Sequence, residues 1–182
     1  MTDEIIAPAQ LQWLIDCGRQ LLDRQGGTPP SRFDVRQPGF VELEPWQQSL
    51  LQQQQQLRWR CRSRFPRPDL WLWTERSLAQ ASDHWSAHYK ANLFPKDQLV
   101  VDACCGAGAD LVALAGRGEV IGIDCDPGLS RLAEDNARSH GYQVQVKSQR
   151  LSSAWQGTGD WLSIDPDRRP AGRLPSATRT AG

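Results

Sequence analysis

The residues best placed for chemistry lie in one short stretch, QLVVDACCGAGAD, at residues 98–110. An apolar run there ends at Asp102, and a turn with Gly106 and Gly108 precedes a predicted helix. A glycine turn that opens a helix presents backbone N–H groups to a ligand. The stretch therefore predicts a nucleotide-type cofactor site at Asp102, Gly106 and Gly108, with Cys104 as a small residue of the turn.

The order of these residues distinguishes between two cofactors. A dinucleotide fingerprint reads G-x-G-x-x-G, and its third glycine allows close packing of helix on strand. Leu111 takes that third position here, whereas Asp102 ends the strand just before the turn. A carboxylate there suits a ligand with an ammonium and a sulfonium group better than it suits a pyrophosphate. The pattern favours S-adenosylmethionine over NAD.

A second strand and helix complete a predicted βαβ unit. Residues 119–124 form an apolar run that ends in Asp124, and Asp126 then supplies a helix N-cap followed by proline. The helical pattern continues until Gly141 stops it. Asp124 is placed to accept hydrogen bonds from ribose hydroxyls, with the adenine near Cys125. The alternative is a purely structural turn, because aspartate often forms turns at strand ends.

Residues 74–169 resemble class I S-adenosylmethionine-dependent methyltransferases, in particular the trimethylguanosine synthase (RNA cap guanine-N2 methyltransferase) family and bacterial relatives with a THUMP-like domain. The matching pieces are LWTERSLAQAS (72–82), VVDACCGAGADLVALA (100–115), VIGIDCDP (120–127), LAEDNARSHG (132–141) and IDPDRR (164–169). The resemblance implies an α/β, Rossmann-like fold. It places Asp102, Gly106 and Gly108 around the methionine part of the cofactor and Asp124 on its ribose, and it implies methyl transfer to RNA of the guanine N2 type.

The fourth motif of that family falls on Asp165 and the residues after it. Asp165 is the candidate to orient the target nitrogen or accept its proton, with Pro166 as the second predicted catalytic residue. Arg168 and Arg169 are expected to contact substrate phosphate. The second proline and the aromatic residue usual in base-methylating members are absent here. The alternative functions are therefore a non-catalytic RNA-binding or scaffold protein, a truncated inactive fragment, and, least favoured, an NAD-dependent oxidoreductase.

The chain divides into a mainly helical region at 1–95, a partial methyltransferase core at 96–169 and a disordered tail at 170–182. The helical region is predicted to contain helices over about 8–24, about 45–60 and from Thr74 to Pro95. The glutamine run 52–56 is expected on a solvated face. Leu78, Ala81, Trp85 and Tyr89 are expected to pack the third helix on the core.

Arginine alternates with aromatic residues between the second and third helices, in RWRCRSRFPRPDLWLW at 58–73. Guanidinium groups bind phosphates and rings stack on bases, so Arg60, Arg62 and Arg64 are candidate RNA contacts. An exposed strand with one polar and one apolar face is the competing interpretation. His84 and His88 have metal-ligand spacing, but a His-Glu-x-x-His site lacks its glutamate here, so no metal is expected.

Composition sets weak bounds on function. The 182 residues carry 21 basic and 21 acidic side chains, so net charge gives no reason to expect nucleic acid or membrane binding. Five cysteines without C-x-x-C pairs, and an acidic start without a signal segment, indicate a reducing cytoplasmic setting. No apolar run reaches the roughly 20 residues of a membrane span.

Four strands are predicted, and the resemblance gives them the spatial order 3-2-1-4; their ranges are 98–103, 119–124, 143–147 and 161–165. The residues after Ile164 show no apolar periodicity. The fourth strand is therefore expected to be an open edge with unpaired backbone groups. A truncated or frame-shifted product, or a partner that covers this edge, is the expected explanation.

Overall fold

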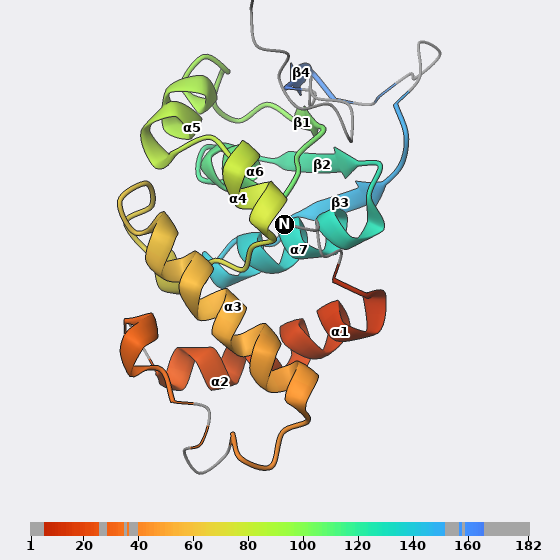
Figure 1. Ribbon diagram of the computed structural model, residues 1–182. Helices are drawn as coiled ribbons and strands as arrows, with labels where there is room; N and C mark the ends of the chain where they lie inside the picture. Colours follow the sequence, from red (N-terminus) through yellow and green to blue (C-terminus); the bar gives the residue numbers. More distant parts are fainter. Residues whose placement is uncertain are drawn as a thin grey trace, which may run out of the picture.

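The computed structural model describes residues 6–25, 29–34, 36, 40–151, 157 and 159–165. A parallel sheet with its helices occupies one part of the molecule, and a group of N-terminal helices packs against it (Figure 1). The predicted tail at 170–182 lies outside the described residues.

Four parallel strands form the sheet in the spatial order β3-β2-β1-β4. Their bounds are Val100–Ala103 for β1, Val120–Asp124 for β2, Gln145–Ser148 for β3 and Trp161–Ile164 for β4. Val100 of β1 pairs with Val120 on one side and with Trp161 on the other. The carboxyl ends of β2, β1 and β4 therefore meet at one edge, which confirms the predicted order and the Rossmann-like α/β fold.

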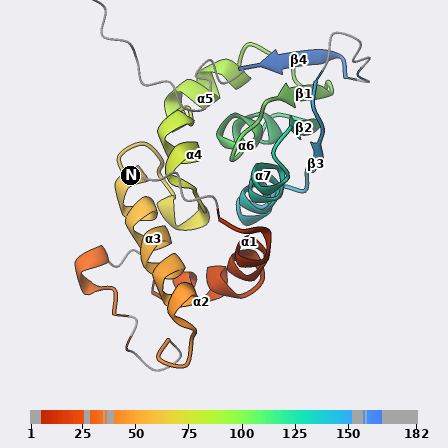
Figure 2. The ribbon, with the colours of Figure 1, turned by 45° about the vertical axis from the view of Figure 1, so that its right-hand side comes forward.

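Helices α5 (His84–Ala91), α6 (Ala109–Ala115) and α7 (Pro127–Ser139) lie on one face of the sheet (Figure 2). Helix α7 begins as predicted, because the Asp126 carboxylate accepts hydrogen bonds from the N–H groups of Gly128 and Leu129. It ends before Gly141, whose φ of +87° lies in the left-handed region that favours glycine. Within the described ranges, no helix covers the opposite face of the sheet.

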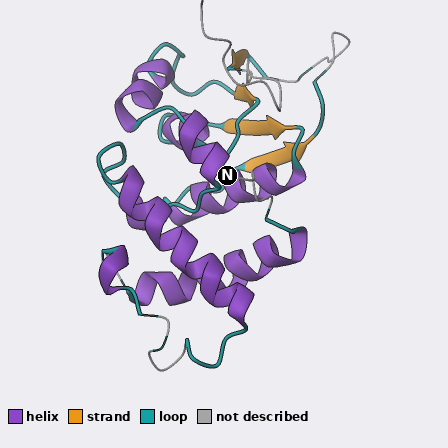
Figure 3. Cartoon of the chain, viewed as in Figure 1, coloured by secondary structure: helices purple, strands orange, loops and turns teal. Residues whose placement is uncertain are grey.

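The N-terminal helices form a separate layer, visible as the lower group of helices in Figure 3. The elements are α1 (Pro8–Trp13), a π-helical turn η1 (Leu14–Gly18), α2 (Arg19–Arg24), a 3-10 turn η2 (Pro30–Arg32), α3 (Pro45–Cys61) and a 3-10 turn η3 (Pro68–Leu70). Helix α4 (Glu75–Gln80) follows and lies between α3 and α5 (Figure 2). Residues 71–73 run extended between η3 and α4 and are buried. The rings of Trp71 and Trp73 stack there with centroids 4.9 Å apart.

A shared core joins the two layers. One apolar cluster contains Leu14, Leu51 and Trp73 from the N-terminal layer together with Val112 of α6 and Leu132 of α7. A second cluster lies between α5, α6 and the strands. Helix α5, which precedes residue 95, thus packs against strands that follow it. The predicted domain boundary at residue 95 stays a prediction.

The helix predicted from Thr74 to Pro95 is wrong as a single helix. Thr74 is the N-cap of α4, as expected, and its hydroxyl accepts from the N–H of Ser77 at 3.0 Å. The chain then leaves the helix at Ala81, and Asp83 caps α5. The break re-orients the second half, so Trp85 and Tyr89 are 78% and 68% exposed instead of packing on the core.

The predicted solvated glutamine run is also wrong in part. Gln54 and Gln55 of α3 are buried. The Gln54 side-chain amide donates to the Trp73 carbonyl at 2.7 Å, and its oxygen accepts from the Trp73 N–H at 3.0 Å. Gln54 thus pairs with the backbone of the extended segment as a neighbouring strand would. These two hydrogen bonds satisfy the buried amide of Gln54. Across the described ranges, the helices are too short or too polar to cross a membrane.

Candidate functional site

The sheet brings together predicted site residues that are far apart in the sequence. Asp102 and Cys104 lie at the carboxyl end of β1, where the chain turns into α6. Asp124 and Cys125 lie at the end of β2, and Asp165 follows β4. Because β1 is the middle strand of these three, its turn faces both neighbours. Ligands of open α/β sheets bind outside the carboxyl ends of the strands, so this edge is the candidate site.

The two glycines of the turn, Gly106 and Gly108, are needed for different reasons. Gly106 and Gly108 both have positive φ values, +56° and +90°. A Cβ on Gly106 would meet nothing within 4 Å, so the backbone there borders open space. A Cβ on Gly108 would lie 3.1 Å from the backbone of Ala133, so this glycine allows α6 to start close against α7. Gly106 thus leaves room for a ligand, and Gly108 serves the packing.

The Asp124 carboxylate organises the turn. One oxygen accepts from the N–H of Gly106 at 2.9 Å, and the other accepts from the N–H of Asp126 at 2.9 Å. Each carboxylate oxygen has a second lone pair, so these bonds leave capacity for a hydroxyl donor. The role of Asp124 toward a ribose stays a prediction, as does the place of adenine near Cys125.

Asp102 is buried, with 3% of its surface exposed, and its Oδ2 has no hydrogen-bond partner among the described residues. Burial raises the pKa of Asp102 well above its usual value, and the nearby charge of Asp110 raises it further, against the opposing effect of Lys90. A buried polar oxygen without a partner costs roughly 1–3 kcal/mol. A cationic group of a ligand at this oxygen would remove that cost.

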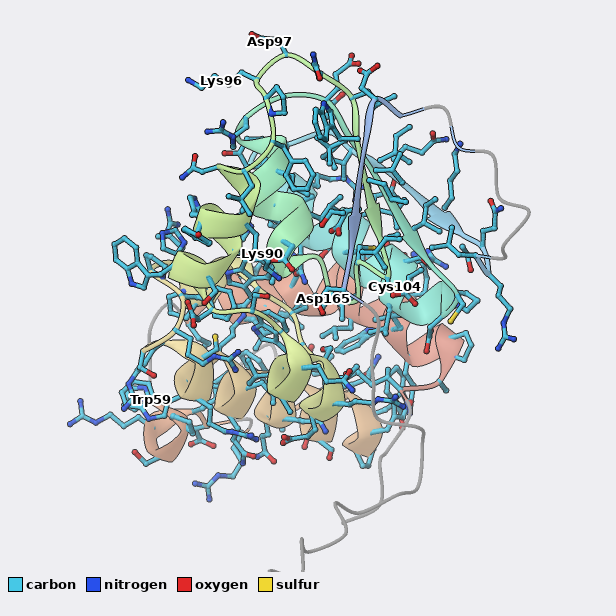
Figure 4. The ribbon with its side chains drawn as sticks, turned by 90° about the horizontal axis from the view of Figure 1, so that it is seen from above. Trp59, Lys90, Lys96, Asp97, Cys104 and Asp165 are labelled. Atoms are coloured by element: carbon cyan, nitrogen blue, oxygen red, sulfur yellow. The ribbon has the colours of Figure 1, made fainter. Side chains whose placement is uncertain are left out.

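Lys90 is a site residue that the sequence analysis missed. Its Nζ donates to the Ser82 hydroxyl at 2.8 Å and to the Asp110 carboxylate, and it lies 3.2 Å from Oδ2 of Asp165. Figure 4 shows Lys90 and Asp165 close together, near Cys104. Burial lowers the pKa of Lys90, but its two carboxylate partners outweigh burial and the net shift is upward. No motif links α5 to the end of β4, because only the fold brings these residues into contact.

The predicted RNA-contacting arginines lie elsewhere. Arg60 pairs with Glu75 at 2.5 Å, and the Arg62 guanidinium covers the Trp59 ring at 4.1 Å. Trp59 lies well to the side of Lys90, Asp165 and Cys104 in Figure 4. A role of this surface in RNA binding stays a prediction.

The competing interpretation of residues 58–73 as an exposed strand is wrong. Residues 58–61 end α3, and Trp71 and Trp73 are buried. Arg64 donates to the carbonyls of Leu78 and Ala81, so it holds the end of α4. Its proposed contact with RNA would compete with these bonds.

Three predicted residues, Pro166, Arg168 and Arg169, lie outside the described residues. Asp165 is exposed at the end of the described chain. In the part of the chain that the structure describes, no three histidine, cysteine, aspartate or glutamate side chains gather closely enough to hold a metal ion.

Comparison with known proteins agrees with this geometry. The family model described as "Methyltransferase domain" matches residues 100–161, which span β1 to the start of β4. This part of the chain is thus similar to a methyltransferase domain. Methyltransferases with this fold use S-adenosylmethionine, and the unpartnered oxygen of Asp102 and the open space at Gly106 fit its cationic methionine part.

Curated relatives match this chain over about half of its length. The 23S rRNA (uracil(1939)-C(5))-methyltransferase of Stenotrophomonas maltophilia is 33% identical over 102 residues, which cover 51% of this chain and 23% of that protein. An uncharacterized methyltransferase of Emericella nidulans is 31% identical over 99 residues, which cover 51% of this chain and 33% of that protein.

A solved structure, that of a putative methyltransferase from Porphyromonas gingivalis W83, shows the same fold. It superposes with a TM-score of 0.59 at 22% identity, over 72% of this chain and 34% of that one. The chain thus spans about a quarter to a third of the length of these relatives.

Proposed function

We propose that this protein transfers a methyl group from S-adenosylmethionine to RNA, with a guanine N2 nitrogen as the proposed acceptor. The observation that carries the cofactor part is Asp102, a buried carboxylate with an unpartnered oxygen beside an open glycine turn. The RNA part is supported by the similarity to a ribosomal RNA methyltransferase and by the resemblance of the motifs to the RNA cap family.

The residues at the strand ends divide the work between them. The bound cofactor supplies an electrophilic methyl group, and transfer is an in-line displacement in which alignment matters most. Asp102 and the turn at Gly106 would hold the methionine part, and Asp124 the ribose, with Cys104 and Cys125 as bordering residues. Asp165 would accept the proton from the target nitrogen.

Lys90 has a defined part in this arrangement. It approaches Oδ2 of Asp165 at 3.2 Å, and no hydrogen bond joins the other oxygen, Oδ1, to the described residues. Lys90 would therefore fix the orientation of the Asp165 carboxylate while Oδ1 stays available to the substrate.

RNA contacts are proposed at two places. Arg62 stacked on Trp59, with Arg60 beside it, offers guanidinium groups and a ring at the end of α3. Arg168 and Arg169 are proposed to bind phosphate next to the acceptor nitrogen. Guanidinium contacts to phosphate make binding strongly salt-dependent.

The open sheet edge and the cysteines support two further parts of the proposal. Trp161, Leu162 and Ile164 of β4 are 45%, 42% and 54% exposed. We propose that further strands, from the same protein or from a partner, cover this edge, since exposed edge strands promote association. All five cysteines are free, in keeping with the proposed reducing cytoplasmic setting.

Calorimetric titration with S-adenosylmethionine tests the cofactor site. Asp102→Asn should weaken binding at least tenfold, because a charge-assisted hydrogen bond contributes roughly 1.5–3 kcal/mol. Asp97→Asn is the matched control, because Asp97 lies before the opposite end of β1 and its positive φ of 60° suits asparagine. Wild-type affinity in Asp102→Asn, or equal binding of NAD, would contradict the assignment.

Transfer of a radiolabelled methyl group to ribosomal RNA, followed by digestion to nucleosides, tests the reaction. Labelled N2-methylguanosine would establish the acceptor, and label in another nucleoside would correct it. Saturable cofactor binding with no label in any RNA would instead favour the non-catalytic RNA-binding protein. Asp165→Asn should lower the rate while leaving cofactor affinity unchanged.

A further inference from the structure

A cavity of about 210 Å³ lies between α5, α6 and the segment before η3. Helix α6 separates it from the sheet: Leu111 and Leu114 pack with the strands, whereas Ala109 and Val112 face the N-terminal layer and line the cavity. Neither Asp102 nor any other residue assigned to the cofactor lines it. The cavity is therefore distinct from the site at the strand ends.

The walls of the cavity suit a flat ligand. Rings of Phe65, Trp71 and Tyr142 form part of the lining, and the wall from α6 consists of small and aliphatic residues. Trp71 also packs against His140, with ring centroids 4.5 Å apart. Pockets for drug-sized ligands measure roughly 300–1,000 Å³. A cavity of 210 Å³ therefore suits a single aromatic ring system.

Three imidazoles line the cavity, those of His84, His88 and His140, and in two of them a carbonyl fixes the position of the ring proton. The Nδ1 of His88 lies 3.0 Å from the His84 carbonyl, and the Nδ1 of His140 lies 2.8 Å from the Asn136 carbonyl. A carbonyl can only accept, so Nδ1 carries the proton in the neutral form of either ring, and Nε2 is then an acceptor. Within the described residues, neither Nε2 has a hydrogen-bond partner. Burial lowers the pKa of His140, which favours this neutral form.

Arg67 adds a donor to the same lining. Its Nε and Nη2 bind the Asp69 carboxylate at 3.3 and 2.9 Å, and no described residue accepts a hydrogen bond from its Nη1. The Asp69 pair fixes the guanidinium plane and leaves Nη1 for a ligand. The cavity thus combines acceptors and a donor around an apolar slot.

We propose that this cavity binds a nucleobase. Nucleobases carry both N–H donors and ring-nitrogen or carbonyl acceptors on the edge of a flat ring, which matches the two imidazoles and the guanidinium. Indole carries a donor but no comparable acceptor, so it serves as the discriminating ligand. The base comes either from a free base or nucleoside, or from an unstacked nucleotide of an RNA strand. This site is additional to the proposed methyl transfer and does not depend on it.

Ligand-observed NMR and calorimetry with adenine, guanine, cytosine, uracil and indole test the proposal on the full chain. At least one nucleobase should bind more tightly than indole. His88→Phe and His140→Phe keep a ring but remove an acceptor, and each should weaken binding about three- to tenfold, the range of one neutral hydrogen bond. His88 is exposed, so His88→Phe should fold normally even if His140→Phe does not. Trp85→Phe is the matched control, because Trp85 is exposed on α5 and does not line the cavity.

The outcomes separate the alternatives. Competition between the bound base and a single-stranded oligoribonucleotide would identify RNA as the source, and no competition would identify a free base or nucleoside. Unchanged S-adenosylmethionine affinity in His88→Phe would show that the two sites are separate. The proposal is overturned if no base binds the wild-type chain, if indole binds as tightly as every base, or if His88→Phe binds like the Trp85→Phe control.

Discussion

Replacement of Asn136 by alanine should lower the free energy of unfolding by about 4 kcal/mol, since each of its hydrogen bonds contributes roughly 1 kcal/mol net. The side chain is fully buried in α7. Its Nδ2 donates to the carbonyls of Leu72 and Ala107, each at 3.0 Å. Its oxygen accepts from the Leu72 N–H at 2.8 Å and from Arg19 Nη2 at 3.1 Å. One amide thus connects both layers to the glycine turn.

Urea unfolding followed by tryptophan fluorescence measures this change. A loss of about 4 kcal/mol is a large part of the roughly 5–15 kcal/mol that stabilises a typical domain. The control is Ser139→Ala, nearly one turn further along α7, where the hydroxyl makes one bond to the Asp135 carbonyl at 3.0 Å and the expected loss is about 1 kcal/mol or less. Because Ala107 lies in the glycine turn, Asn136→Ala should also weaken cofactor binding. Equal losses in the two variants would refute the reasoning.

Further predictions concern the turn, the pH dependence and the arginines. Gly108→Ala should lower the free energy of unfolding by roughly 2 kcal/mol or more, because its φ is +90° and the new Cβ would lie 3.1 Å from the backbone of α7. Gly106→Ala, in open space, should lower it by about 1 kcal/mol and mainly weaken cofactor binding. Equal melting temperatures of these two variants would contradict the assignment. Burial, and after it the charge of Asp110, raises the native pKa of Asp102. The protonated side chain therefore stabilises the folded state fully below its unfolded pKa of about 3.9. This contribution is lost as the pH rises through the native pKa. Asp102→Asn should therefore flatten the fall in melting temperature above about pH 4, and an unchanged pH profile would count against the raised pKa. Arg64→Met should lower the free energy of unfolding by about 2 kcal/mol, since it removes charged donors from the end of α4. The exposed Arg62→Met is the control, and chemical unfolding should show a change under about 0.5 kcal/mol. Equal effects of the two substitutions would reject the capping role of Arg64.

Local patterns predicted the framework of the core well. Asp126 caps α7 and Gly141 follows its end. These features depend on neighbouring residues: a cap bonds N–H groups two and three positions away, and a left-handed stop needs only glycine. The order of Asp102 and the two glycines depends on the same short range, so the sequence also indicated the class of cofactor.

Two features of the helical region were not predicted from these patterns. The helix break at Ala81 came from the second cap at Asp83, and it turned Trp85 to solvent. Gln54 became a buried partner of Trp73 because the extended segment passes beside α3. The Asp83 cap is a local signal that was not recognised as a break, whereas the Gln54 contact joins residues 19 apart and no periodicity encodes it.

The sequence by itself determined the strand–turn–helix unit and the acidic residues at the strand ends, and it indicated the type of cofactor, because these follow from spacing within about twenty residues. Only the tertiary structure decided that Lys90 contacts Asp165, that Arg64 holds α4 and that Asn136 joins two layers. The physical reason is that charges and buried amides select partners by proximity in space. The folded chain sets that proximity over 75 residues for Lys90 and Asp165 and over 64 for Asn136 and Leu72.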